Sequence, residues 1–179
     1  APQSLVDFGC MDGCFTNRYG LLGYKVIGLD LCKSSIELAN KKAKEFNTNA
    51  NHILTYFKDA NQHIEDGSQD YVTTSDSYEH LLDPVEEMFK PAKKMLKKKS
   101  GKFLLVTPYK SWMRGKFVPL ADPWVHGKDN NEPWNHPRPR NHLIAPTVWS
   151  VVKQLESVGF HINQGFVSFC SPNSDVPEQ

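Results

Sequence analysis

Short apolar runs alternate with longer amphipathic segments along most of the chain. A nearly continuous short apolar run predicts a buried strand, whereas apolar residues that recur every three or four positions predict a helix. By these criteria the strands lie at 4–8, 25–29, 52–57, 70–75 and 102–107, and the helices lie at 14–22, 34–46, 84–98 and 147–158. Strands that alternate with helices form a parallel sheet with helices on both faces. The pattern therefore predicts a three-layer α/β fold.

Two short apolar runs, 160–163 and 166–169, end the pattern and are separated only by Gln164 and Gly165. A parallel connection needs a dozen or so residues, so this short link predicts that the last strand runs antiparallel to its neighbour. The run 102–107 is almost entirely apolar, which is typical of a strand in the middle of a sheet. We therefore expect a mostly parallel sheet with one reversed strand at the end.

Length and composition fit a single domain. The 179 residues can bury a sizeable core, and a formal net charge of +1 gives no reason to expect a nucleic-acid partner. No apolar run approaches the roughly 20 residues that span a bilayer. The four cysteines form no C-x-x-C pair, which favours a reducing compartment and predicts a cytoplasmic protein.

The segment 108–145 departs from the alternation of strands and helices. Of the chain's 12 prolines, seven lie between Pro108 and Pro146, which excludes a long helix or a central strand there. The segment is also rich in indole and imidazole side chains, which are Trp112, Trp124, Trp134, His126, His136 and His142. A long irregular loop is usually functional, and ligands of open α/β sheets bind beyond the carboxyl ends of the strands. We therefore expect this insertion to cover an acceptor substrate.

A loop with two glycines follows the first predicted strand and reads Gly9-Cys-Met-Asp-Gly13. Glycine permits a sharp turn and a close approach of a ligand, and the loop leads into a helix whose first amides have no partner within the helix. The second strand ends at Asp30, whose carboxylate can bind both hydroxyls of a ribose. The G-x-G-x-x-G fingerprint of hydride-transferring enzymes does not fit, because the spacing differs and its third glycine is missing.

The loop resembles motif I of class I S-adenosylmethionine-dependent methyltransferases, which have a Rossmann-like fold. Gly9 and Gly13 stand at the first and third glycines of that motif, and Met11 stands at the middle one. The segment 70–84 resembles the FDxVxxxxxxEHLxDP stretch of the type 11/12 group, and 155–160 resembles its LLexaGF ending. The resemblance implies a seven-stranded, mostly parallel sheet with an antiparallel terminal strand. It also implies S-adenosylmethionine as the cofactor and S-adenosylhomocysteine as the product.

The resemblance further implies which residues bind the cofactor. Asp7 would hydrogen-bond the loop or bind the cofactor's amino group, Asp30 would bind the ribose, and Asp59 would lie near the adenine amine. The full expected set is Asp7, Gly9, Cys10, Met11, Gly13, Asp30, Leu31, Asp59, Ala60 and Ser75. Most enzymes of this build carry a helix or two before the first strand, so we expect 1–179 to be one domain of a longer polypeptide with further domains.

The candidate catalytic residues lie after the fourth strand and in the insertion. Methyl transfer is an in-line displacement, so alignment supplies much of the rate, and a hydroxyl acceptor must also lose a proton. A positioned histidine adds about 10²–10⁴-fold to such a reaction. The candidate bases are His80, His142 and His136, of which the first two flank the expected methyl position, with Asp76 and Glu79 as orienting groups or alternative bases. A purely structural role of His80 in its turn is an equal alternative.

A metal-dependent reaction is an alternative that we do not favour. Asp76, Glu79, His80 and His142 resemble the ligand set of small-RNA 2′-O-methyltransferases, in which a divalent ion positions the hydroxyl. The lysines between 93 and 99 lie at the end of a predicted helix and offset its dipole, so we interpret them as a solvated face. RNA is therefore an unlikely substrate on charge grounds, and no metal is expected.

The acceptor that we predict is a sugar, a glycan or a similar polar small molecule that is methylated on oxygen. Indole rings can cover the apolar C–H face of a sugar, while histidine and arginine side chains bind its hydroxyls. Many relatives of the type 11/12 group methylate sugars or other small metabolites. The substitution at Met11 leaves another alternative open, which is a non-catalytic binding module that retains the fold.

Overall fold

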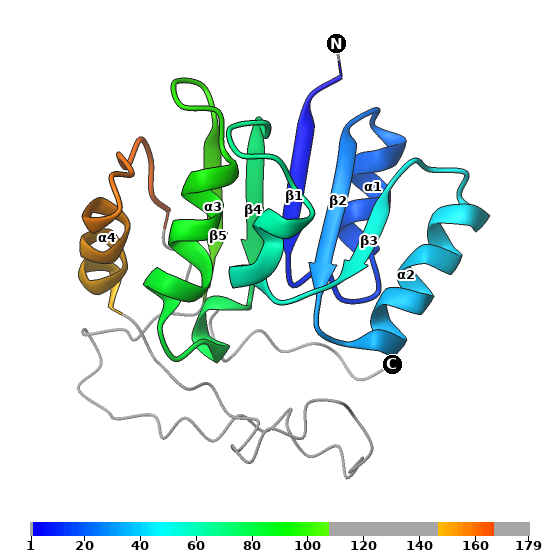
Figure 1. Cartoon of the computed structure of the whole chain (residues 1–179), viewed down its shortest axis with the longest axis horizontal. Coiled ribbons are helices and arrows are strands. Elements are labelled where there is room, and N and C mark those ends of the chain that lie inside the picture. The colour runs from blue at the N-terminus through cyan, green and yellow to red at the C-terminus, as the bar shows by residue number, and fades with distance from the viewer. Residues whose placement is uncertain (1, 108–146, 167–179) are drawn as a thin grey trace, which may run out of the picture.

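The computed structural model describes residues 2–107 and 147–166 (Figure 1). Within these two ranges five strands form one sheet in the order β3-β2-β1-β4-β5, and every neighbouring pair is parallel. The strands are β1 (Ser4–Phe8), β2 (Lys25–Asp30), β3 (Asn51–Leu54), β4 (Tyr71–Ser75) and β5 (Lys102–Val106). The predicted α/β fold with a parallel sheet is therefore confirmed.

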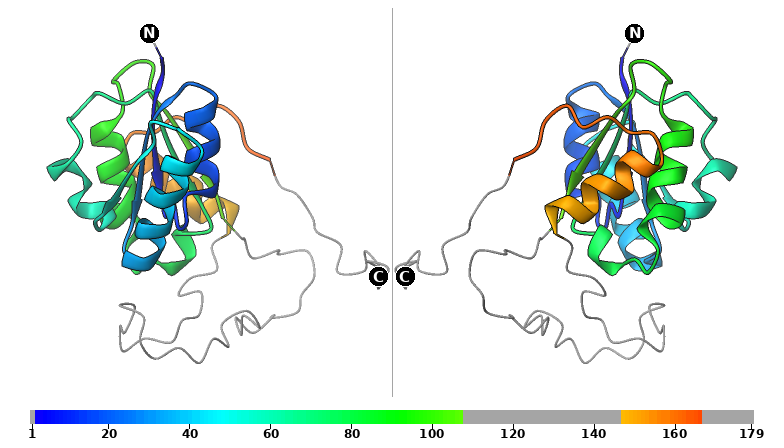
Figure 2. Two further views of the ribbon diagram at one scale, coloured as in Figure 1. Left: turned by 90° about the vertical axis from the view of Figure 1, so that its right-hand side faces the viewer. Right: turned by 90° about the vertical axis from the view of Figure 1, so that its left-hand side faces the viewer.

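Helices and short helical turns connect the strands. They are α1 (Cys14–Leu21), α2 (Lys33–Glu45), η1 (Phe57–Gln62), η2 (Tyr78–His80), η3 (Val85–Phe89), α3 (Lys90–Met95) and α4 (Val148–Ser157). Figure 2 shows α1 on one face of the sheet and α3 on the other, and in Figure 1 α4 lies beyond the β5 end. Within the described ranges, none of these helices is long and apolar enough to cross a bilayer.

The larger core cluster fixes the central strands, whose carboxyl ends carry the candidate site. Val6 and Phe8 of β1 and Val72 of β4 are completely buried in it. Phe57 of η1 stacks on Phe8 with the two ring centroids 4.8 Å apart. Burial of one such side chain contributes about 1.5–3 kcal/mol to stability. The ends of β1 and β4 are therefore held firmly.

Two predicted elements differ in extent from the structure. β3 ends at Leu54 rather than at 57, because Phe57 starts the 3-10 helix η1 and turns into the core. The helix predicted at 84–98 is a π-helical turn, η3, followed by the short α3. Pro91 explains this division, because proline lacks an amide hydrogen and its ring displaces the carbonyl four residues earlier.

The strand predicted at 160–163 is not present in the structure. Gly159 has a left-handed φ of 80°, and the amide of Phe160 donates to the carbonyl of Leu155, so the chain here closes α4 instead. Among the described residues β5 pairs only with β4, so its central place in the sheet stays a prediction. The insertion 108–145 and nearly all of the run 166–169 lie outside the described residues.

Candidate functional site

The loop between β1 and α1 folds back over the end of β2. The amides of Gly9 and Cys10 both donate to the carbonyl of Leu29, at 2.9 and 3.1 Å. Gly9 and Gly13 have φ values of 79° and 76°, a left-handed conformation that favours glycine. A Cβ on Gly13 would lie 2.7 Å from the side-chain nitrogen of Asn17. The backbone path of the loop therefore requires both glycines.

Met11 adopts a left-handed conformation, which glycine adopts more readily than any other residue. Its φ is 46°, and its side chain is 65% exposed, so the methionine does not fill the loop. A non-glycine residue in this region costs about 1–2 kcal/mol, which a well-fixed loop can absorb. The substitution therefore leaves the shape of the loop intact, and the geometry does not favour a binding module that has lost the cofactor.

Asp30 organises the same loop from the end of β2. One carboxylate oxygen accepts a hydrogen bond from the amide of Met11 and the other accepts from the amide of Cys32, both at 2.8 Å. Asp30 is only 3% exposed, and Leu31 beside it is 39% exposed. Each oxygen retains a second lone pair, so the carboxylate can hold the loop and still accept from a ribose hydroxyl. These residues thus fit an adenosyl cofactor.

Asp7 lies beneath the loop in a buried position on β1. The hydroxyl of Thr73 on β4 donates to its carboxylate at 2.8 Å, and the two residues are direct partners in the β1–β4 register. Burial raises the pKa of Asp7 to about 6, the hydrogen bond from Thr73 opposes that rise, and the charge of Asp30 adds to it. Thr73 could not be recognised from the sequence, because only strand pairing brings it to Asp7.

Two further contacts fix the loop from behind. The amine of Lys42 on α2 donates to the carboxylate of Asp12 at 2.5 Å, and this bond holds the pKa of Asp12 below its usual value. The thiol of Cys10 is buried against Gly28, where an added Cβ would lie 2.7 Å from the sulfur. Burial raises the pKa of the Cys10 thiol, so this thiol stays protonated. The loop is therefore preorganised for a ligand.

The residues expected near the adenine lie in η1 rather than directly after a strand. Asp59 is half-buried, whereas Ala60 is completely buried in the core. The side chain of Ala60 thus packs against the protein and serves to place η1, and Asp59 is the acidic group of this turn.

The second part of the site follows β4. Ser75 ends the strand, and Asp76 is exposed with a left-handed φ of 52°. Glu79 is only 1% exposed, and its carboxylate accepts a hydrogen bond from the hydroxyl of Thr107 at 3.1 Å. The imidazole of His80 is 47% exposed, and its Nε2 lies 4.0 Å from a carboxylate oxygen of Glu79. His136 and His142 lie outside the described residues.

Ser77 joins the two parts of the site, and sequence reasoning did not single it out. Its hydroxyl donates to the carbonyl of Phe8 at 3.4 Å, and a Cβ on Gly9 would lie only 2.1 Å from that hydroxyl. The glycine loop and the segment that carries Glu79 are therefore in direct contact. The position of Ser77 inside the segment 70–84 was the one available sign.

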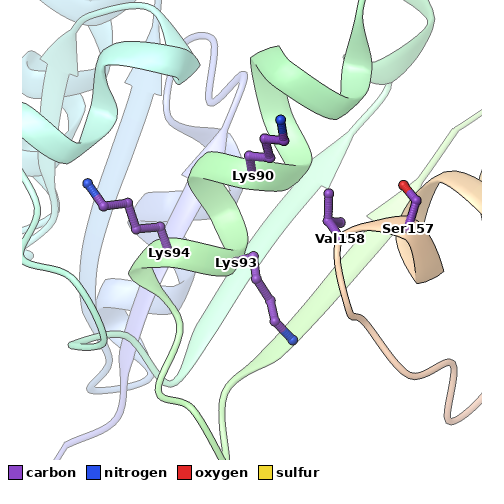
Figure 3. A pocket seen from close by; sticks show the side chains of 5 residues that line it. All are labelled: Lys90, Lys93, Lys94, Ser157 and Val158. Atoms are coloured by element: carbon purple, nitrogen blue, oxygen red, sulfur yellow. The ribbon is translucent and has the colours of Figure 1, made fainter.

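A shallow pocket of about 350 Å³ between α3 and α4 is separate from this site (Figure 3). Its lining consists of Lys90, Lys93, Lys94, Ser157 and Val158. The three lysines are engaged with Glu86, the carbonyl of Gly159 and Asp66, respectively. No residue of the glycine loop lines the pocket, so it is not the cofactor site. Within residues 2–107 and 147–166, no cluster of histidine, cysteine and carboxylate side chains could hold a metal ion.

Comparison with known proteins decides the family. A family model described as a methyltransferase domain matches residues 1–164. The chain belongs to this methyltransferase family. Together with the fold and the loop, the match confirms the predicted class I, S-adenosylmethionine-dependent methyltransferase. No curated protein sequence matches the chain.

Solved structures similar to this methyltransferase differ in what their names describe. The PH0226 protein from Pyrococcus horikoshii OT3 is 30% identical, with a TM-score of 0.54, over 60% of this chain and 47% of that one. Phosphoethanolamine N-methyltransferase 2 from Haemonchus contortus, in complex with S-adenosylmethionine, is 18% identical, with a TM-score of 0.70, over 89% and 33%. The [4+2]-cyclase SpnF is 15% identical, with a TM-score of 0.71, over 92% and 53%. The methyltransferase chain thus spans about half or less of these proteins' lengths.

Proposed function

We propose that this methyltransferase transfers the methyl group of S-adenosylmethionine to a hydroxyl group of a sugar, a glycan or a similar polar small molecule. The observation that carries the proposal is the pair formed by buried Glu79 and half-exposed His80 at the end of β4. A hydroxyl acceptor must lose a proton during methylation, and an imidazole that is backed by a carboxylate suits that step.

The chemistry divides between the two parts of the site. When bound, S-adenosylmethionine supplies an electrophilic methyl group; the glycine loop and Asp30 hold the cofactor and so set the position of that methyl. The acceptor oxygen would bond to the methyl carbon as the carbon–sulfur bond breaks and S-adenosylhomocysteine leaves, and the hydroxyl proton would pass to a ring nitrogen of His80. The resulting imidazolium lies about one ion-pair distance, 4.0 Å, from the carboxylate of Glu79, which attracts it. Thr107 hydrogen-bonds that carboxylate and restrains it.

The choice of a sugar-like acceptor rests on the composition of the insertion 108–145, with its three tryptophans and three histidines. The fold alone selects no acceptor, because similar folds belong to a phosphoethanolamine N-methyltransferase and to a [4+2]-cyclase. Aromatic rings suit the apolar face of a sugar and hydrogen-bonding groups suit its hydroxyls, and the sequence of this segment contains both.

The proposal is tested by assaying methyl transfer with S-adenosylmethionine and panels of sugars, quinols and amines. We expect turnover on sugar hydroxyls, and activity confined to amines would refute the proposal. For the base, His80→Gln should lower kcat by about 10²–10⁴-fold and leave the affinity for S-adenosylhomocysteine unchanged. His161→Gln, at an exposed histidine beyond α4, is the matched control and should keep full activity.

A further inference from the structure

A buried histidine that the cofactor site does not use lies directly behind the glycine loop. His52 is on β3, next to Gly28 of β2 in the strand register, and is only 4% exposed. A Cβ on Gly28 would lie 2.8 Å from a ring carbon of His52, and one on Gly13 would lie 3.0 Å from its Nε2. The imidazole therefore occupies the space immediately below the last residue of the loop.

The hydrogen bonds around His52 fix which ring nitrogen carries the hydrogen. The side-chain nitrogen of Asn40 on α2 donates to the backbone carbonyl of His52 at 3.2 Å. The atom of Asn40 that faces the ring is therefore its side-chain oxygen, which can only accept. That oxygen lies 3.1 Å from Nδ1 of His52, so Nδ1 must donate. In the neutral ring Nε2 is then an acceptor, and the hydroxyl of Thr16 donates to it at 2.6 Å.

The ring is kept neutral by its surroundings. The two side chains that hydrogen-bond the ring, Thr16 of α1 and Asn40 of α2, carry no charge. The thiol of Cys10 lies on the same glycine of β2, Gly28, and is protonated. Burial lowers the pKa of His52 to about 4, so Nε2 remains an acceptor at neutral pH.

Thr16 connects this histidine to the cofactor loop. It is completely buried in the first turn of α1, and its hydroxyl also lies 3.2 Å from the carbonyl of Gly13. A hydroxyl has one hydrogen, so the 2.6 Å bond to His52 competes with a bond to Gly13. His52 thus sets the direction of the Thr16 hydroxyl, and through it the position of the first turn of α1 and of Gly13 at the end of the loop.

We propose that His52 is a positioning residue for the cofactor site, which acts through Thr16 to hold the glycine loop and the start of α1 in the conformation that binds the adenosyl cofactor. Asn40 sets the orientation of the ring, and Thr16 transmits it. An apolar side chain of the same size would fill the space but would not hold the hydroxyl. The role is therefore one of geometry and goes beyond filling the core.

The test is the affinity for S-adenosylhomocysteine, measured by calorimetry at a temperature where every variant is folded. His52→Leu and Thr16→Val each remove the hydrogen bond and should weaken binding about tenfold. His52→Gln can still accept from Thr16, and Thr16→Ser retains a hydroxyl, so both should bind within about threefold of the wild type. If His52→Leu does not fold, the comparison between the two Thr16 variants decides the question.

Two controls separate positioning from general loss of stability. Thr147→Val removes the hydroxyl that caps α4, away from the glycine loop, and it should not change the affinity. Met95→Ala removes a completely buried side chain on α3, so it should lower the melting temperature without changing the affinity. The proposal is overturned if folded Thr16→Val binds as the wild type does. It is also overturned if Met95→Ala weakens binding as much as Thr16→Val.

Discussion

At the scale of single residues, the loop shows that backbone conformation matters more than residue type at the middle position of the motif. Met11 adopts the left-handed conformation with its side chain in solvent, whereas Gly13 is enclosed by Asn17 and Ala39. Sequence alone shows that a glycine is missing at position 11. It does not show that the φ of 46° has been retained, because that follows from the contact of the Met11 amide with Asp30.

Substitutions in the loop should therefore have unequal effects. Met11→Gly relieves about 1 kcal/mol of backbone strain, but it raises the conformational entropy of the unfolded chain, which costs a similar amount of stability. Stability and S-adenosylhomocysteine affinity should therefore stay close to wild type. Gly13→Ala forces a Cβ against two neighbours at a φ of 76° and should destabilise by more than about 2 kcal/mol. Urea unfolding and calorimetry measure both. Equal destabilisation by the two variants would contradict this account of the loop.

Residues that are marked by a turn or by the end of a strand could be singled out from the sequence. Asp30 and the two glycines belong to this group, because strand ends and turns can be recognised from local pattern. Ser77, Thr73 and His52 were missed, because each acts through a contact with a distant part of the chain. Such contacts depend on strand register, which one sequence does not display.

At the scale of elements, Lys93 of α3 makes two contacts with the residues that close α4. The amine of Lys93 donates to the carbonyl of Gly159 at 2.6 Å and lies 4.7 Å from the centre of the Phe160 ring. This contact uses the end of α4 that replaced the predicted strand at 160–163. The short apolar run at 160–163 predicted a strand, but the left-handed Gly159 turns the chain back, and the amide of Phe160 bonds to the end of α4.

Removal of the Lys93 contacts should destabilise α4 more than the rest of the fold. Lys93→Met loses a hydrogen bond and a cation–π contact, which together amount to about 1–2 kcal/mol. Hydrogen exchange of the α4 amides should accelerate accordingly, while exchange in β1 should change less. Lys90→Met is the control, because Lys90 pairs with Glu86 on its own helical segment and such exposed pairs contribute little. Equal acceleration in both variants would argue against this role of Lys93.

At the scale of the whole molecule, two buried groups beneath the site have opposite effects on the pH dependence of folding stability. The pKa of Asp7 is raised to about 6, so the folded state binds a proton that the unfolded state lacks, and Asp7 stabilises the fold as pH falls from 6 towards 4. The pKa of His52 is lowered to about 4, so the unfolded state takes up the proton first, and stability falls over the same window. Each effect amounts to as much as about 3 kcal/mol.

The wild-type protein should therefore show little net pH dependence from these two groups between about pH 4 and 6. Asp7→Asn should lose stability on acidification from pH 6.5, because only the His52 effect remains. His52→Gln should instead gain stability relative to wild type as pH falls. Urea unfolding at pH 7, 5.5 and 4.5 measures these differences. Parallel pH profiles for the two variants would contradict the opposed roles.

The central claim is that the loop from Gly9 to Gly13 and the carboxylate of Asp30 form the cofactor cradle. Calorimetric titration with S-adenosylhomocysteine tests it most directly. We expect one saturable site in the wild type and about 10–100-fold weaker binding in Asp30→Asn, which weakens the bonds to the ribose and to the loop. Asp66→Asn, at an exposed carboxylate paired with Lys94, should bind normally. No heat with the wild type, or unchanged binding by Asp30→Asn, would contradict the claim.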